Sequence, residues 1–223
     1  MLHFIALVFL VIWLVSRKFA PNIYNYVILK MTSKWYRTVL EDISEDSKVL
    51  DIGIGPGSAL VANSTILKDK NISVIGVDYD EVYVNYAKSL INKENLQNRI
   101  KVKCASVYDV EALKLGQFEA VYFSGSFSLL PDPIKALETV NNLLVKNGII
   151  YITQTYQKKS VFGMKFLKPL LRYITTIDFG QLVYEYELEN LLKNSNFKVL
   201  ENKTMAHDHD YYQSARFIKL ASK

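Results

Sequence analysis

The chain has 223 residues, half of them apolar, and a formal net charge of +5 at neutral pH. A chain of this length and composition is expected to bury a core as one folded domain with an appendage, which argues against intrinsic disorder. Its single cysteine, Cys104, excludes an internal disulfide, and its place in an apolar strand predicts a buried thiol in a reducing compartment.

The positive charge is concentrated in two segments. Residues 1–40 and residues 154–177 each contain five basic and no acidic residues, so the rest of the chain carries −5. A nucleic-acid enzyme usually places its basic surface around the catalytic groove. Here the positive charge lies on an N-terminal extension and one later segment, which favours an anionic membrane surface as partner and argues against nucleic acid.

The N-terminal segment is strongly apolar. Between residues 2 and 15 only His3 is not apolar. Continued through Ala20, a helix of about 19 residues would reach about 28 Å, close to the thickness of a bilayer core. We expect Pro21 to end this helix.

The basic residues next to this run predict its orientation. Arg17 and Lys18 follow the apolar run and no lysine or arginine precedes it. The positive-inside rule therefore predicts a single-pass transmembrane helix over residues 1–20, a juxtamembrane linker over residues 21–35 and a catalytic domain on the cytoplasmic side. The membrane of the endoplasmic reticulum or of the mitochondrion is compatible with this orientation. A cleaved targeting segment or a helix that packs on a partner remains an alternative.

From residue 36 the chain alternates predicted strands and helices. Short buried strands are expected at 47–53, 72–78, 100–106, 118–125 and 148–153, with helices near 58–69, 81–93, 133–146 and 184–195. Asp132 and Pro133 are typical of a helix start. The segments FKVLENKTM and QSARFIKLA predict two further strands. This alternation predicts an α/β domain over residues 36–223, with a mostly parallel Rossmann-like sheet and helices on both faces.

A glycine-rich turn follows the first predicted strand, in the sequence VLDIGIGPG. After Asp51 come Gly53, Gly55 and Gly57, which let the backbone bend sharply and approach a ligand without obstruction by a Cβ atom. In a parallel sheet, ligands bind at this end of the strands. Dinucleotide-binding enzymes have a glycine at the sixth place of this turn, where this chain has Ser58.

A second polar residue follows the next strand. Asp78 lies 21 residues after Gly57, at the end of the second predicted strand, where it can accept hydrogen bonds from ribose hydroxyls. Together the two features predict a ligand that contains adenosine and lies across the first two strands.

These motifs, in this order, resemble class I S-adenosylmethionine-dependent methyltransferases of the type 11/12-like kind. The resemblance implies S-adenosyl-L-methionine as cofactor and a sheet that is parallel except for an antiparallel final strand. In VLDIGIGPG it implies that Asp51 is oriented toward the methionine end of the cofactor. In VIGVDYD it implies Asp78 on the ribose and Tyr79 near the adenine.

Two later motifs carry the rest of the resemblance. CASVYDV resembles the segment that closes over the adenine, which implies Ser106 and Val107 as adenine contacts. Many members have an acid where this chain has Ser106. Asp109 is an alternative contact to the adenine, or it only caps the next turn. VYFSGSFSLLPDPIKAL resembles the fourth-strand motif, which implies that Ser124 and Gly125 border the methionine and methyl sites.

The sequence gives less direct evidence on the identity of the methyl acceptor. S-adenosylmethionine already carries an activated methyl group, so the protein mainly has to align the acceptor and exclude water, and a base is needed only for weakly acidic acceptors. The fourth-strand motif lacks the Asn/Asp-Pro-Pro-aromatic signature of nucleic-acid amino-methyltransferases. It more closely resembles enzymes that act on small molecules, quinones, sterols and other lipids.

Two segments could contact the acceptor. Residues 156–181, a substrate-side insert, alternate basic with apolar residues, which is typical of a lid helix, a membrane or lipid contact, or a protein-docking segment. His207 and His209 are weak candidates for a general base, and the alternative is a polar hairpin turn. Two histidines at this spacing make a poor metal site, so no metal is expected.

The leading hypothesis is therefore a membrane-anchored methyltransferase acting on a lipid, quinone-like or other small amphipathic acceptor. The alternatives are an anchored protein methyltransferase and a non-catalytic subunit of a membrane complex.

Overall fold

A seven-stranded sheet forms the centre of the protein. The computed structural model describes residues 2–157, 184–193, 195–205 and 213–222, with side chains described from Arg17 onward in the first helix. The strands are β1 (Lys48–Ile52), β2 (Ser73–Asp78), β3 (Ile100–Cys104), β4 (Phe118–Ser124), β5 (Leu144–Gln157), β6 (Phe197–Thr204) and β7 (Gln213–Ser222), in the spatial order β3-β2-β1-β4-β5-β7-β6.

The direction of the strands agrees with the sequence prediction. The pairs β1–β2, β2–β3, β1–β4 and β4–β5 are parallel, and β7 is antiparallel to both β5 and β6. Only the final strand therefore runs against the others. The carboxyl ends of the six parallel strands meet at one edge of the sheet, and this edge is where a ligand is expected.

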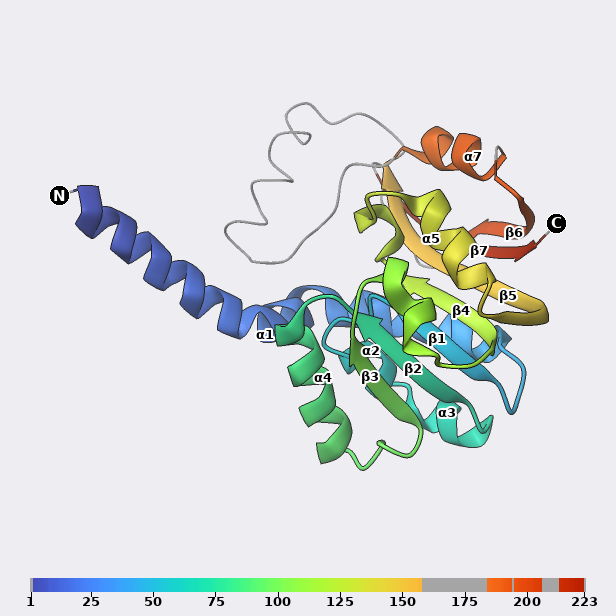
Figure 1. Ribbon diagram of the computed structural model, residues 1–223, viewed down its shortest axis with the longest axis horizontal. Helices are drawn as coiled ribbons and strands as arrows, with labels where there is room; N and C mark the ends of the chain where they lie inside the picture. The colour runs from blue at the N-terminus through green and yellow to red at the C-terminus, as the bar shows by residue number, and fades with distance from the viewer. Residues whose placement is uncertain (1, 158–183, 194, 206–212, 223) are drawn as a thin grey trace.

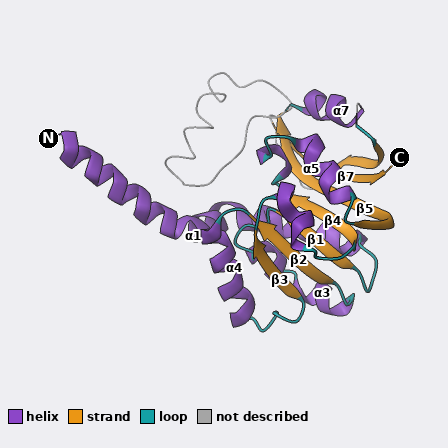
Figure 2. Cartoon of the chain, in the orientation of Figure 1, coloured by secondary structure: helices purple, strands orange, loops and turns teal. Residues whose placement is uncertain are grey.

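Helices cover both faces of the sheet (Figures 1 and 2). One face packs against α1 (Leu2–Asp42), α2 (Ser58–Val61), α3 (Ser64–Asp69) and α4 (Glu81–Lys93). The other face packs against the 3₁₀ turns η1 (Val107–Leu113) and η2 (Phe127–Leu129) and the helices α5 (Pro133–Asn141) and α7 (Glu185–Lys193). Alternating buried residues on the strands supply both hydrophobic cores.

Most of the predicted elements form, with shifted boundaries. Asp132 caps α5 as expected, because its carboxylate accepts a hydrogen bond from the backbone N–H of Lys135 at 3.0 Å. However, α5 ends at Asn141 and β5 begins at Leu144, although the sequence predicted a helix to residue 146. The early start of β5 follows from an extra pairing of Leu144 with Phe118, which an irregularity separates from the main register.

The first helix differs from its prediction. It runs without interruption from Leu2 to Asp42, so Pro21 lies inside the helix and does not end it. Contacts on both sides of Pro21 hold α1 against α4: Arg17 forms an ion pair with Asp80 at 3.3 Å, and the Tyr24 ring packs edge-on against Tyr83. These contacts offset the loss of the hydrogen bond that proline cannot donate.

No helix in the described part of the chain is long and apolar enough to cross a membrane. The expected transmembrane segment, residues 1–20, lies mostly among residues whose side chains are outside that part. The N-terminal end of α1 projects away from the sheet (Figure 1).

Cys104 is exposed, so the prediction of a buried thiol was wrong. The reason lies in the order of the strands. β3 is the edge strand of the sheet, and its burial alternates so that Lys101 and Lys103 face solvent, as does Cys104 at its end. The Cys104 sulfur lies 3.7 Å from the backbone oxygen of Tyr79.

Candidate cofactor site

The glycine-rich turn lies where the strand order reverses. β1 pairs with β2 on one side and with β4 on the other, so the connections leaving its two neighbours run in opposite directions along the sheet. Such a switch point leaves a crevice at the carboxyl edge of the sheet. The turn of residues 53–57 connects β1 to α2 at this edge.

The structure explains why the turn needs glycine. Gly53 has a φ of +75°, and a Cβ atom on it would lie 2.4 Å from the Cβ of Ser126. Gly55 also has a positive φ, +58°, but no atom lies within 4 Å of the place where its Cβ would be. Gly53 therefore allows close packing between two loops, whereas Gly55 leaves one side of the turn open.

Asp78 joins the second strand to this turn. Its Oδ2 atom accepts a hydrogen bond from the Gly55 N–H and its Oδ1 atom one from the Asp80 N–H, both at 2.9 Å. Burial raises the pKa of Asp78, although these backbone donors act in the opposite direction. Each carboxylate oxygen keeps a further lone pair, so Asp78 can hold the turn and still accept ribose hydroxyls.

Asp51 lies beneath the turn and is paired with a tyrosine of α1. The Tyr36 hydroxyl donates to its Oδ2 atom at 2.6 Å, and both residues are buried. Burial raises the pKa of Asp51 to about 7, opposed by the Tyr36 hydrogen bond and reinforced by the charge of Asp78. Among the described residues, its Oδ1 atom has no hydrogen-bond partner. A buried acceptor without a partner fits the ammonium end of a methionine group.

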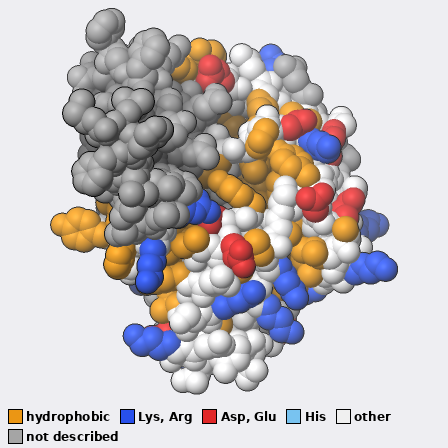
Figure 3. All heavy atoms as spheres, turned by 60° about the vertical axis from the view of Figure 1, so that its left-hand side comes forward, with side chains coloured by type: hydrophobic (Ala, Val, Ile, Leu, Met, Phe, Trp, Pro, Cys, Tyr) orange, Lys and Arg blue, Asp and Glu red, His pale blue; other side chains and the backbone are white. Residues whose placement is uncertain are grey.

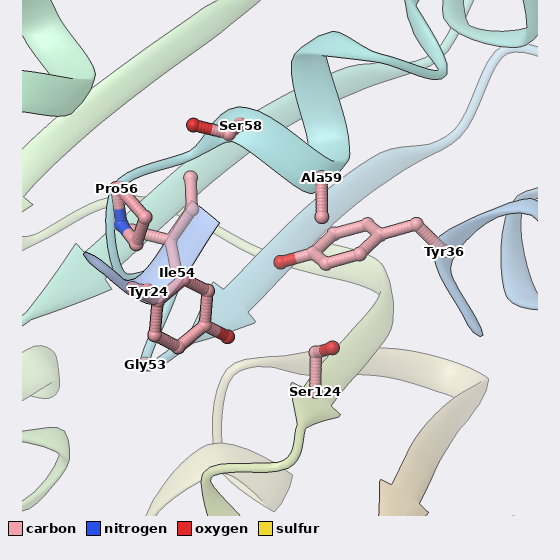
Figure 4. Close-up of a pocket in the computed structure, with 8 residues that line it drawn as sticks. All are labelled: Tyr24, Tyr36, Gly53, Ile54, Pro56, Ser58, Ala59 and Ser124. Carbon is pink, nitrogen blue, oxygen red and sulfur yellow. The ribbon is translucent and has the colours of Figure 1, made fainter. Parts of the chain in front are cut away.

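A pocket forms between this turn, α1 and the end of β4 (Figure 4). The two tyrosine rings of α1 face the turn across it. Burial raises the pKa of Tyr24 to about 12, so this phenol is neutral at physiological pH. The pocket is lined by Tyr24, Tyr36, Gly53, Ile54, Pro56, Ser58, Ala59 and Ser124.

Tyr24 and Tyr36 were not predicted as site residues. Neither tyrosine belongs to a motif, and both were assigned to the N-terminal extension or to the first residues of the domain. A helical spacing of aromatic residues before the first strand was the only available signal, and it is equally typical of an ordinary core helix.

The predicted adenine contacts lie at the same edge but in different environments. Tyr79 directly follows β2 and is 68% exposed. The Ser106 hydroxyl caps η1 by accepting from the Tyr108 N–H at 3.3 Å, and Val107 is buried in the core. Asp109 lies in the first turn of η1. The roles of these residues toward adenine stay predictions.

The end of β4 closes the pocket on the other side. Ser124, the last residue of the strand, is buried and reaches the pocket. Ser126, in the loop that follows, donates a hydrogen bond to the backbone oxygen of Ile52 and so ties this loop to β1. The buried Gln154 of β5 accepts from the Ser128 N–H at 3.3 Å, which ties the same loop to β5.

Two predicted acceptor-side features lie outside the described residues. These are His207 and His209, and nearly all of the insert 156–181. Their flanking strands are described, however: Gln213 at the start of β7 pairs with Gln157 at the end of β5. The described ends of this connection, Met205 and Gln213, therefore lie at the carboxyl edge of the sheet.

This sheet order, with the glycine turn and Asp78 at its switch point, defines a class I S-adenosylmethionine-dependent methyltransferase domain. The profile of the methyltransferase domain family matches residues 43–213, and the chain belongs to this family. Methyltransferase domains of this class use S-adenosyl-L-methionine as their cofactor.

This chain matches only part of the length of each sequence relative. A ribosomal protein L11 methyltransferase from Alkaliphilus oremlandii is 29% identical over 108 residues, which is 48% of this chain and 34% of that protein. A carboxy-S-adenosyl-L-methionine synthase from Actinobacillus pleuropneumoniae is 23% identical over 114 residues, which is 51% of this chain and 47% of that protein. The chain thus matches between a third and a half of these relatives.

Solved structures share the fold over most of the chain. A methyltransferase from Thiobacillus denitrificans in complex with S-adenosyl-L-homocysteine has a TM-score of 0.64 at 12% identity and covers 91% of this chain and 97% of its own. A methyltransferase from Geobacter sulfurreducens, solved with the same ligand, has a TM-score of 0.61 at 15% identity. The match covers 85% of this chain and 91% of that protein. At these identities the likeness concerns the fold.

Proposed function

We propose that this protein is a membrane-anchored methyltransferase that transfers a methyl group to a lipid, quinone-like or other small amphipathic acceptor. One observation carries the proposal. The apolar run of residues 2–15 and the tyrosines that line the pocket belong to the same helix, α1. A bilayer that holds this apolar run would lie near the pocket, where a lipid-soluble acceptor is available.

The residues of the chain have distinct tasks in this reaction. Bound S-adenosyl-L-methionine supplies a methyl group on a sulfonium centre, which an aligned nucleophile can accept. Asp78, held in place by the Gly55 N–H, would orient the ribose side, and Asp51 would hold the amino end. Tyr24 and Tyr36 cover the turn and exclude water from it. Alignment and exclusion of water are the main contributions that this chemistry needs from the protein.

The test begins with cofactor binding by calorimetry on the full-length protein in detergent. The whole chain is needed because Tyr24 lies in α1, and a fragment beginning at residue 36 would lack one wall of the pocket. We expect Asp78→Ala to lose at least ten-fold in affinity, as one lost charged hydrogen bond is worth about 1.5–3 kcal/mol. The control is Asp69→Ala, at an exposed position of α3.

A labelled-methyl assay on membranes then identifies the acceptor class. Label in the lipid extract supports the proposal, and label only in protein contradicts it. If a folded protein binds no cofactor, the alternative of a non-catalytic subunit replaces the proposal.

A protein acceptor is the second candidate. It is favoured by the 29% identity to a ribosomal protein L11 methyltransferase and by the negative charge of the rest of the chain, which suits a basic protein substrate. The labelled-methyl assay separates the two candidates, because basic proteins remain in the protein fraction after lipid extraction.

A further inference from the structure

We infer that α1 carries a second binding surface, an outer face that lies on anionic lipid headgroups and places the cofactor pocket one helix diameter from the membrane. This inference deepens the proposed function and rests on it. We define the outer face by six residues: Phe19, Tyr26, Val27, Lys30, Lys34 and Arg37.

The six residues share one side of the helix. Counted from Phe19, the others follow at spacings of seven, eight, eleven, fifteen and eighteen residues, which all fall on one face at 3.6 residues per turn. The opposite side of the same helix packs against the domain, where Trp35 and Val39 are buried in the core. Helix α1 therefore has one face in the protein and another in solvent.

The outer face is apolar at one end and cationic at the other. Phe19 is 50% exposed, Tyr26 93% and Val27 56%. Lys30, Lys34 and Arg37 are all exposed, and no acidic residue occurs between residues 17 and 40. Large exposed apolar side chains gathered on one helix face indicate a binding surface. Figure 3 shows one face of the whole molecule, on which apolar, basic and acidic side chains lie beside one another.

The chemistry of the face matches an anionic membrane surface. Aromatic and aliphatic side chains enter the boundary between headgroups and acyl chains, while lysine and arginine bind the phosphates. The apolar end of the face is also the end nearer to the apolar run of residues 2–15 in the same helix. Because α1 is one uninterrupted helix, the outer face can lie on the headgroups only if the apolar run of residues 2–15 also lies along the membrane boundary. We therefore take this run as an anchor parallel to the membrane surface and not as a helix that crosses it.

The position of the pocket gives this surface a role. Tyr24 lies between the outer-face residues in sequence but points into the pocket from the other side of the helix. A helix with its side chains is about 10–12 Å across. If the outer face lies on the headgroups, the pocket is about that far from them, within reach of an amphipathic acceptor that stays partly in the bilayer.

The experiment measures contact at one position, because the apolar run itself is expected to bind any vesicle. A polarity-sensitive dye is attached to Tyr26→Cys of the full-length protein in a Cys104→Ser background. The protein is mixed with phosphatidylcholine vesicles, with or without phosphatidylglycerol, that carry a spin-labelled quenching lipid. The control dye is attached to Lys146→Cys, at an exposed position near the start of β5.

We expect strong quenching at position 26 with phosphatidylglycerol, weaker quenching without it, and none at position 146. Replacing Lys30, Lys34 and Arg37 with glutamine should weaken the contact by roughly a hundred-fold. High salt should have the same effect on the unsubstituted protein. Cofactor affinity should stay unchanged, since none of these residues lines the pocket.

Three results would overturn the inference. Equal quenching at both positions would show contact that is not specific to the outer face. Quenching at position 26 that is equally strong with and without phosphatidylglycerol would show that Lys30, Lys34 and Arg37 do not bind anionic headgroups. A dye response without vesicles that depends on protein concentration would assign the face to a second copy of the chain. Quenching without methyl transfer to lipid would refute the proposed acceptor but leave the surface, so the two failures are distinguishable.

Discussion

The buried Asp51 should make the stability of this protein depend on pH in a way that one substitution removes. Its pKa rises from 3.8 to about 7 on folding. Between these values the folded state binds more protons than the unfolded state, so stability falls as pH rises from about 4 through about 7. A difference of one in pKa corresponds to about 1.4 kcal/mol, so the full effect is about 4 kcal/mol.

The substitution Asp51→Asn tests this reasoning. The asparagine oxygen can still accept the Tyr36 hydroxyl, which lies 2.6 Å from the native carboxylate, but the side chain no longer titrates. We expect the variant and the unsubstituted protein to be similarly stable near pH 4. Near pH 8 the variant should be more stable by as much as about 4 kcal/mol.

Urea unfolding of the full-length protein without cofactor, followed at several pH values by tryptophan fluorescence, measures this difference, because Trp35 is buried in the core. Titrating groups that do not interact with Asp51 contribute equally to both proteins and cancel. The control is Asp69→Asn, at an exposed position of α3, whose stability should follow that of the unsubstituted protein. A difference between Asp51→Asn and the unsubstituted protein that is independent of pH, or that shrinks as pH rises, would refute the assignment of a raised pKa to Asp51.

Three further predictions concern stability and exposure. Gly53→Ala should destabilise the protein without cofactor by more than the roughly 1–2 kcal/mol that positive φ alone costs. Gly55→Ala should cost only that amount, because its Cβ meets no neighbour. Equal urea midpoints for the Gly53→Ala and Gly55→Ala variants would contradict the close contact at Gly53. Lys70→Met should cost about 1–3 kcal/mol in the same assay, because the Lys70 ammonium donates to three backbone carbonyls at the end of α1, and an unchanged midpoint would argue against this cap. A water-soluble maleimide should label Cys104 in the folded protein nearly as fast as in urea; protection of several orders of magnitude would mean that the thiol is buried after all.

Local patterns in the sequence predicted the parts of the structure that depend on neighbouring residues. The alternation of strands and helices follows from hydrophobic periodicity, and the cap at Asp132 from side-chain chemistry. The glycine turn and Asp78 were identified because both follow directly after strands, and the carboxyl ends of parallel strands necessarily meet at one edge.

Other features depended on which distant segments pack together. Cys104 is exposed because β3 is an edge strand, a position set by the order of the whole sheet. Pro21 stays inside α1 because contacts with α4 hold the helix on both sides. Local propensity does not contain these contacts, since they join residues about 60 positions apart.

The pocket combines both kinds of information. The amino-acid sequence by itself determined the glycine turn after the first strand, because glycine spacing and a strand-end acid act over a few residues. Only the tertiary structure decided that Tyr24 and Tyr36 form the opposite wall and that the Tyr36 hydroxyl pairs with Asp51. A helix can place a side chain in a distant site without any local motif, because packing of its buried face against the sheet sets where each side chain points.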